Sequence, residues 1–129
     1  MASTEEVDSY LIKMGLPYEQ VGQGTWVVRP DSTRSAQIGV QIDEPIVLFS
    51  MNMFKVEPGF GPREDLYRTL LELNAELLHS SYALEGDQIV LSGAQQLENL
   101  DFNEFQGVID DFTMALGNHY ETIKSFRKA

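Results

Sequence analysis

Residues 65–100 read DLYRTLLELNAELLHSSYALEGDQIVLSGAQQLENL, and the first half of this stretch has the spacing of an amphipathic helix. Its apolar residues recur at steps of three and four, which places them on one face of a helix. They are Leu66, Leu70, Leu73 and Leu77, with Tyr67, Leu71 and Leu78 widening the stripe. We therefore expect a mostly buried helix that ends at His79, with Leu70, Leu73 and Leu77 in the core.

The second half of the stretch alternates as a pair of strands does. Tyr82 and Leu84 occupy alternate positions, and so do Ile89 and Leu91 after the turn residues Gly86-Asp87. This pattern predicts an antiparallel hairpin directly after the helix. Nothing in the stretch has the residue pattern of a catalytic site, so a functional prediction must rest on surfaces and on resemblance.

A short helix is predicted near the start of the chain. Ser3 and Glu6 have the spacing of a capping box. Apolar residues then recur at steps of three or four until Gly15. The extended segments 18–21 and 25–28 flank the flexible residues Gly22-Gln23-Gly24. They form either one strand with a bulge or a tight hairpin.

The remaining patterns complete an α+β domain. Residues 38–42 alternate as a strand with one wet face, and Asp101 and Glu104 repeat the capping spacing before a helical stripe from Phe105 to Phe126. Tight turn signals join neighbouring strands directly. We predict one domain over residues 1–129, with a mainly antiparallel five-stranded sheet and helices packed on it.

The strand predicted at residues 46–54 is apolar on both faces. Val47, Phe49, Met51 and Met53 occupy one parity, and Ile46, Leu48 and Phe54 occupy the other. A strand in a one-sided sheet alternates more cleanly, so the second face is expected to meet a helix, a second copy or a client. We take Val47, Phe49, Met51 and Met53 as the candidate protein-binding or dimer surface. The alternative is a central strand that this chain covers by itself.

Composition narrows the class of partner. The 129 residues include 20 acidic and 9 basic ones, which gives a net charge of -11. Such a field repels phosphate backbones and anionic headgroups, so nucleic-acid and membrane partners are disfavoured, while basic protein segments are attracted. There is no cysteine. No apolar run suits a signal-peptide core or approaches the roughly 20 residues that span a bilayer, so we expect a cytoplasmic protein.

Residues that could carry chemistry are few. His79 and His119 are the only histidines and lack the helical pairing of a zinc site, so we expect structural roles for both. Asp110-Asp111 and Glu5-Glu6 are adjacent carboxylates, and neighbours on a helix point about 100 degrees apart. We interpret both pairs as solvated helix faces. The sequence therefore predicts no catalytic residue, no metal and no cofactor.

The order of elements resembles the type III secretion chaperone (CesT-like) fold, which is shared with the YbjN-type bacterial sensory-transduction regulator family. The most specific part is LLELNAELL at residues 70–78, followed by SYALEGDQIVLSG at residues 81–93, and GTWVV at residues 24–28 also fits. The resemblance covers most of the chain. It implies a small acidic homodimer in the cytoplasm that holds an extended segment of a secreted client on apolar patches, without a cofactor.

Two functions remain open. The first is a non-enzymatic protein-binding module of chaperone type, in which strand 46–54 and the last helix supply a dimer surface and a groove for a client. The second is a YbjN-type regulator that senses a small molecule or a partner protein. Both functions depend on binding at the protein surface and need no catalytic residue.

Overall fold

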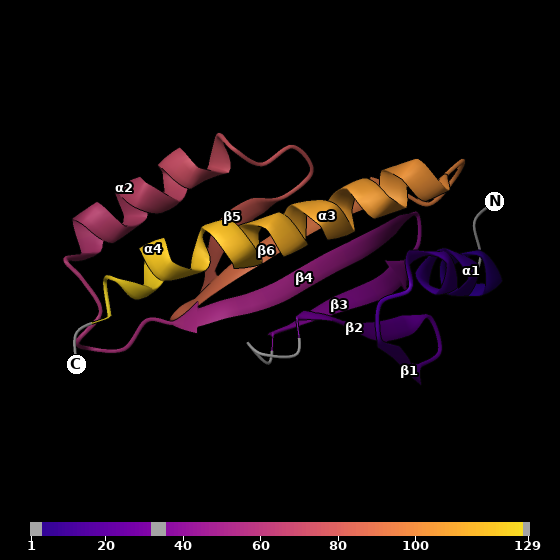
Figure 1. Cartoon of the computed structure of the whole chain (residues 1–129), viewed down its shortest axis with the longest axis horizontal. Coiled ribbons are helices and arrows are strands. Elements are labelled where there is room, and N and C mark those ends of the chain that lie inside the picture. The colour runs from indigo at the N-terminus through magenta and orange to yellow at the C-terminus, as the bar shows by residue number, and fades with distance from the viewer. Residues whose placement is uncertain (1–3, 32–35, 128–129) are drawn as a thin grey trace.

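The computed structural model describes residues 4–31 and 36–127 and has one sheet with helices packed against it, which confirms the α+β class (Figure 1). The elements in chain order are α1 (Thr4–Met14), β1 (Tyr18–Gly22), β2 (Thr25–Asp31), β3 (Ala36–Asp43), β4 (Ile46–Lys55), α2 (Arg63–Asn74), β5 (Ser81–Glu85), β6 (Gln88–Gln96), α3 (Phe102–Asn118) and α4 (Tyr120–Lys124). Ser3 of the predicted capping box lies outside the described residues.

The sheet is antiparallel between all neighbours and has six strands in the order β1-β2-β3-β4-β6-β5. The antiparallel prediction is confirmed, but the predicted count of five strands is wrong by one. The difference lies at the start, where Tyr18 pairs with Val28 and Gly22 with Thr25 in a tight hairpin. Gly24 adopts a φ of 70°, a left-handed conformation that costs glycine little, so the chain reverses there instead of forming one bulged strand.

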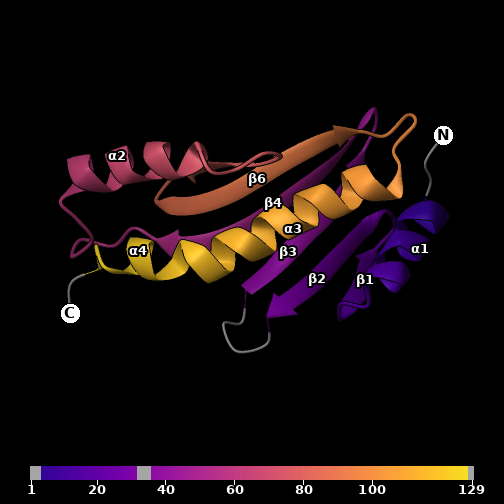
Figure 2. The ribbon, with the colours of Figure 1, turned by 45° about the horizontal axis from the view of Figure 1, so that its top comes forward.

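The helices leave one face of the sheet open. In Figures 1 and 2, α3 runs across the sheet on the same side as α1 and α4, with α2 beside the β5 edge. On the covered face the strand residues are buried, namely Trp26, Val28, Ile38, Val40, Val47, Phe49, Met51, Ile89 and Leu91. Their neighbours Gln41, Ser50 and Ala94 are exposed on the other face. The domain thus has one apolar layer between the sheet and the helices.

Polar contacts set the position of two helices. The Trp26 indole N–H donates to Asp8 of α1 at 2.7 Å, which ties this helix to β2. Asp101 and Glu104 form the predicted capping box at the start of α3. The long helix predicted to reach Phe126 is instead interrupted at His119, which ends α3 and precedes α4.

The helix that opens the central stretch is shorter and less buried than its pattern predicts. α2 ends at Asn74, so Leu77 and Leu78 lie in the connection to β5. Leu66 and Leu70 are buried, but 71% of Leu71 is exposed and Leu73 is only partly buried. The reason is position: α2 packs against β5 and α4 at the edge of the fold, where a helix has only one covered side.

Candidate functional site

The structure places the predicted binding residues of β4 inside the single chain. Val47, Phe49 and Met51 are almost fully buried under α3, where Phe105 packs on Phe49 with ring centroids 5.4 Å apart, and Met53 is partly buried. This corrects the choice of Val47, Phe49 and Met51 as an available surface, because the chain covers these side chains itself, whereas Met53 lies at a bulge in the pairing of β4 with β6 and is only partly covered. The candidate interaction surface must lie elsewhere.

Exposed apolar side chains gather at the β5 edge of the sheet, on α2 and β5. Tyr67 and Leu71 of α2 and Leu84 of β5 are exposed, and they flank a groove with a cavity volume of about 240 Å³. We call this feature the α2–β5 groove, lined by Tyr67, Leu70, Leu71, Asn74, Tyr82, Ala83 and Leu84. The leucine stripe was visible in the sequence, but the side of the helix left uncovered was not.

The groove has a defined floor because α2 is attached to the edge strand. Asn74, the last residue of α2, accepts a hydrogen bond from the Tyr82 backbone N–H at 2.7 Å. β5 pairs only with β6 on its inner side, so this bond satisfies an outer backbone group that an edge strand leaves without a ladder partner. The helix and the strand therefore present their apolar side chains together.

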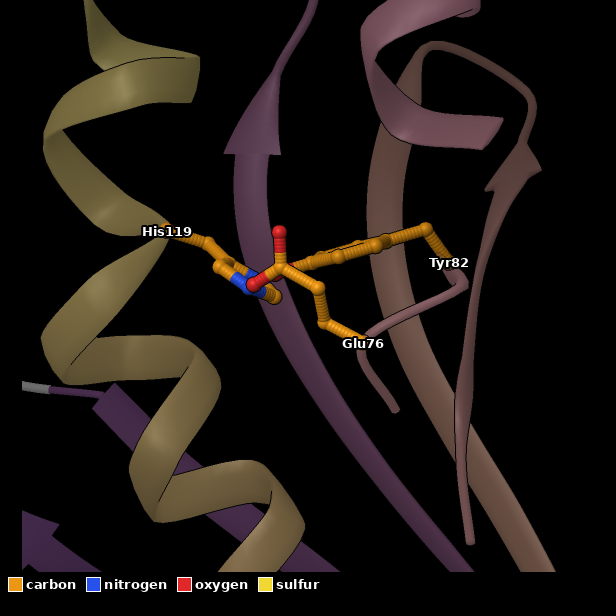
Figure 3. Close-up of polar contacts among 3 residues, drawn as sticks. All are labelled: Glu76, Tyr82 and His119. Atoms are coloured by element: carbon orange, nitrogen blue, oxygen red, sulfur yellow. The ribbon is translucent and has the colours of Figure 1, made fainter. Parts of the chain in front are cut away.

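Tyr82, which lines the groove, belongs to a polar cluster with His119 and Glu76 (Figure 3). His119 is 1% exposed, with Nδ1 2.8 Å from the Tyr82 hydroxyl and Nε2 3.0 Å from Glu76 Oε1. Burial raises the pKa of Tyr82, and the negative charge of Glu76 raises it further, so the phenol keeps its proton. With neutral His119, the tyrosine O–H donates to Nδ1 and the Nε2–H donates to Glu76. The expected structural role for His119 agrees with this arrangement.

A second polar anchor holds the α2–β5 loop, residues 75–80. One carboxylate oxygen of Asp111 accepts hydrogen bonds from the backbone N–H groups of Leu78 and His79 at 2.9 and 2.6 Å, and from the Ser80 hydroxyl at 3.0 Å. The interpretation of Asp111 as solvated is wrong, since it is 7% exposed, whereas Asp110 is exposed. Its spacing from Val108 and Ala115, three before and four after, was the available signal, since it places Asp111 on the apolar face of α3.

Other kinds of site find no support in the described part of the chain. No helix of residues 4–31 and 36–127 is long and apolar enough to cross a membrane. Within the same ranges, no group of three or more histidine, aspartate and glutamate residues is arranged to hold a metal ion. The features that distinguish this surface are therefore its exposed apolar side chains and its sheet edges.

Comparison with known proteins identifies the family. The family model named CesT_Tir_1 matches residues 1–129, so the chain belongs to the CesT_Tir_1 family. This confirms the resemblance inferred from the leucine-rich helix and its hairpin. A search of curated proteins gave no match.

Solved structures with the same fold include secretion chaperones. A chain of the heterodimeric ExoU–SpcU complex from the type III secretion system of Pseudomonas aeruginosa matches with a TM-score of 0.69 and 15% identity, over 92% of this chain and 98% of its own. The type III secretion chaperone SycH of Yersinia pestis, solved with a fragment of YscM2, matches at 0.56 and 16%, over 90% and 94%. YbjN from E. coli matches at 0.57 and 14%, over 89% and 92%. Because all three identities are low, the likeness concerns the fold.

Proposed function

We propose that this protein is a non-enzymatic, chaperone-like binding module of the bacterial cytoplasm that forms a homodimer and binds a segment of a client protein. The observation that carries the proposal is the exposed apolar surface of the α2–β5 groove, with Tyr67, Leu71 and Leu84 in one place. Apolar side chains grouped in this way on a small protein typically mark an interaction site. The family and the chaperone complexes among the solved structures give further support.

The groove suits a second copy of the chain. A two-fold interface brings the same patch of both subunits together, so every apolar side chain in it is used twice. Leu71 is 71% exposed, and full burial of a leucine contributes about 1.5–3 kcal/mol. Two copies of Leu71, Tyr67 and Leu84 would form an apolar centre of the kind that dominates interface energetics.

The charge of the protein favours a basic client. The net charge of -11 attracts basic segments and speeds their association at low ionic strength. The open face of the sheet and its free strand edges offer main-chain and side-chain contacts to such a segment. Client binding and dimer formation therefore use different parts of the surface in this proposal.

Sensing of a small molecule, the alternative implied by the YbjN-type resemblance, has less support. The apolar α2–β5 groove has a volume of about 240 Å³, below the roughly 300–1,000 Å³ of typical small-molecule sites. A larger cavity of about 590 Å³ lies between residues 78–81 and 92–95, but most of its lining is serine, glycine or alanine, whereas small-molecule sites are lined mainly by apolar and aromatic side chains. It is also an edge groove of exposed side chains, which suits protein side chains better than an enclosed ligand. The geometry therefore favours the protein-binding function.

Molar mass in solution tests the dimer directly. We expect light scattering after size exclusion, at micromolar concentration, to give twice the chain mass of 14.6 kDa. Leu71→Asp should give the monomer mass with an unchanged circular dichroism spectrum, because an aspartate cannot be buried in an apolar interface. Ile12→Asp is the matched control, since Ile12 is 67% exposed on α1 and lies far from the groove in sequence. A monomeric wild type, or a dimer that survives Leu71→Asp, would contradict the proposed interface.

A further inference from the structure

The face of the sheet that no helix covers carries no charge at its centre. Alternate residues of paired strands point to the same side of a sheet, so the register of β2 to β6 gives the side chains that share this face. None of them is ionisable, although 22% of the chain is charged and its net charge is -11. We call this surface the neutral face, made by Thr25, Val27, Gly39, Gln41, Leu48, Ser50, Asn52, Ser81, Ala83, Val90, Ser92 and Ala94.

The neutral face is hollowed by a cavity of about 310 Å³. Val90 lines this cavity and is only 2% exposed, although it points away from the helices, so the surface is recessed there. Gly39 keeps the cavity open, because an added Cβ would lie 3.4 Å from the Ser50 hydroxyl oxygen. The cavity of about 590 Å³ beside the α2–β5 loop shares Leu48 and Ser92 with it, so the two hollows adjoin.

Polar side chains of the neutral face line the smaller cavity without partners of their own. Gln41 and Asn52 are exposed and carry carboxamides, each with N–H donors and a carbonyl acceptor. Thr25, Ser50 and Ser92 add hydroxyl groups. Within the described residues, none of these five side chains makes a hydrogen bond. The cavity therefore offers a set of neutral groups that can both donate and accept.

These properties select a class of ligand. Sheet faces that bind single-stranded nucleic acid use aromatic side chains and basic residues, and the neutral face has neither. An anionic ligand would be repelled by Glu85, which also lines the cavity, and by the net charge of the chain. A neutral sugar has hydroxyl groups that donate and accept, as carboxamides and hydroxyls do, and its C–H groups suit Leu48 and Val90. Strand faces bind oligosaccharides in the OB-fold as well.

We propose that the neutral face binds a neutral oligosaccharide. The carboxamides of Gln41 and Asn52 hydrogen-bond to its hydroxyl groups, and Leu48 and Val90 contact its C–H groups. A polyhydroxylated ligand needs a polar lining, which the apolar α2–β5 groove does not provide. The inference goes beyond the proposed function and does not depend on it, because the ligand occupies the centre of the open face and leaves the groove to a second copy.

Neutral tetrasaccharides test the proposal on the full chain. Maltotetraose, cellotetraose and tetra-N-acetylchitotetraose are each titrated into isotope-labelled protein and followed by NMR. We expect at least one of them to bind with a Kd of about 1 mM or tighter and to shift the side-chain amide signals of Gln41 and Asn52. Tetragalacturonate, a carboxylated sugar of the same length, should not bind, because Glu85 and the net charge repel it.

Substitutions on the neutral face test the location. Gln41→Ala and Asn52→Ala should each weaken binding about tenfold, since the hydrogen bonds of one carboxamide are lost. Asn103→Ala is the matched control, because Asn103 is exposed on α3, on the other side of the sheet (Figure 1). Gly39→Val should abolish binding by filling the cavity beside Ser50. Gly39 does not have a positive φ, so a β-branched residue suits this strand position, and circular dichroism checks the fold of each variant.

Three results would overturn the inference. The first is that none of the three neutral sugars binds, and the second is that tetragalacturonate binds as tightly as they do. The third is binding that leaves the Gln41 and Asn52 signals unchanged and persists in both alanine variants, which would place the sugar elsewhere. The dimer is judged separately by its molar mass.

Discussion

The centre of this sheet at β4 and its edge at β5 are held to the helices by different kinds of contact. Beneath β4, aromatic rings pack closely, with Phe105 between Phe49 and Tyr10 at centroid distances of 5.4 and 5.6 Å. At the β5 edge the connections are polar: Asp111 holds the α2–β5 loop and His119 bonds to Tyr82. The first region buries nearly all its apolar side chains, while the second exposes leucines. The difference separates the part of the fold that supplies stability from the part available to partners.

This contrast explains how one small domain can have both a core and the exposed apolar edge that we propose as its binding surface. A helix held at its end by hydrogen bonds does not need its whole apolar stripe to stay in place, so Leu71 and Leu84 remain available. The hydrogen bond between Asn74 and the Tyr82 backbone also fixes the backbone of α2 relative to β5, which lowers the backbone entropy lost on association. The polar anchors thus hold α2, the α2–β5 loop and β5 in fixed positions relative to one another.

The largest expected effect is in the aromatic region. Phe49→Ala should lower the free energy of unfolding by about 3–5 kcal/mol, because a fully buried ring is lost and a cavity remains. Urea denaturation at low protein concentration, where the chain is monomeric, measures it. Under the same conditions Leu71→Ala should change the free energy by less than about 0.5 kcal/mol, as exposed positions do. Equal losses for both variants would remove the distinction between the two regions.

Asp111→Ala tests the polar side of the comparison. Three donors lose their charged acceptor, so we expect the free energy of unfolding to fall by about 1.5–3 kcal/mol. Amide exchange at Leu78 and His79 should accelerate in the variant. The neighbour Asp110 is exposed, and Asp110→Ala should stay within about 0.5 kcal/mol of wild type. If both variants behave alike, the loop is held by other contacts.

Leu73→Ala measures how far the core extends into α2. Because Leu73 is only partly buried, we expect a loss of about 1–2 kcal/mol, less than the 2–5 kcal/mol of a fully buried leucine. Leu66→Ala, on the buried side of the same helix, should fall in that larger range. Thermal or urea unfolding of the two variants side by side gives the comparison. A larger loss at Leu73 than at Leu66 would reverse the orientation assigned to α2.

Sequence patterns predicted the elements well and the environment of each face poorly. The Gly86 turn and the Asp101 capping box each report local backbone structure, and each matches the structure, while the leucine spacing located α2 but extended it five residues past its end at Asn74. Burial depends on which element packs opposite. α3 covers Val47, Phe49 and Met51, and α2 lies at an edge where Leu71 stays 71% exposed. Neither fact is contained in local periodicity.

The polar anchors were missed for the same reason. Asp111 and His119 act across sequence separations of 31 to 43 residues, on Ser80 and Glu76 among others, so a local pattern could not pair them. A carboxylate on the apolar face of a helix is the sequence signal to look for, since a buried charge needs hydrogen-bond partners. The surface predicted at Val47, Phe49 and Met51 is core instead, because apolar parity alone does not separate a core from an interface.

The smallest expected effect is a pH dependence from Tyr82. Burial and then Glu76 raise its pKa in the folded chain, whereas the unfolded tyrosine titrates near 10. Below about pH 10 both states keep the proton, so this group gives no pH dependence. Above it the unfolded chain loses a proton that the folded chain retains, so stability should fall by up to about 1.4 kcal/mol per pH unit. Urea unfolding at several alkaline pH values should therefore give a shallower decline for Tyr82→Phe than for wild type. Parallel declines would mean that Tyr82 loses its proton as easily when folded as when unfolded, so that neither its burial nor Glu76 raises its pKa.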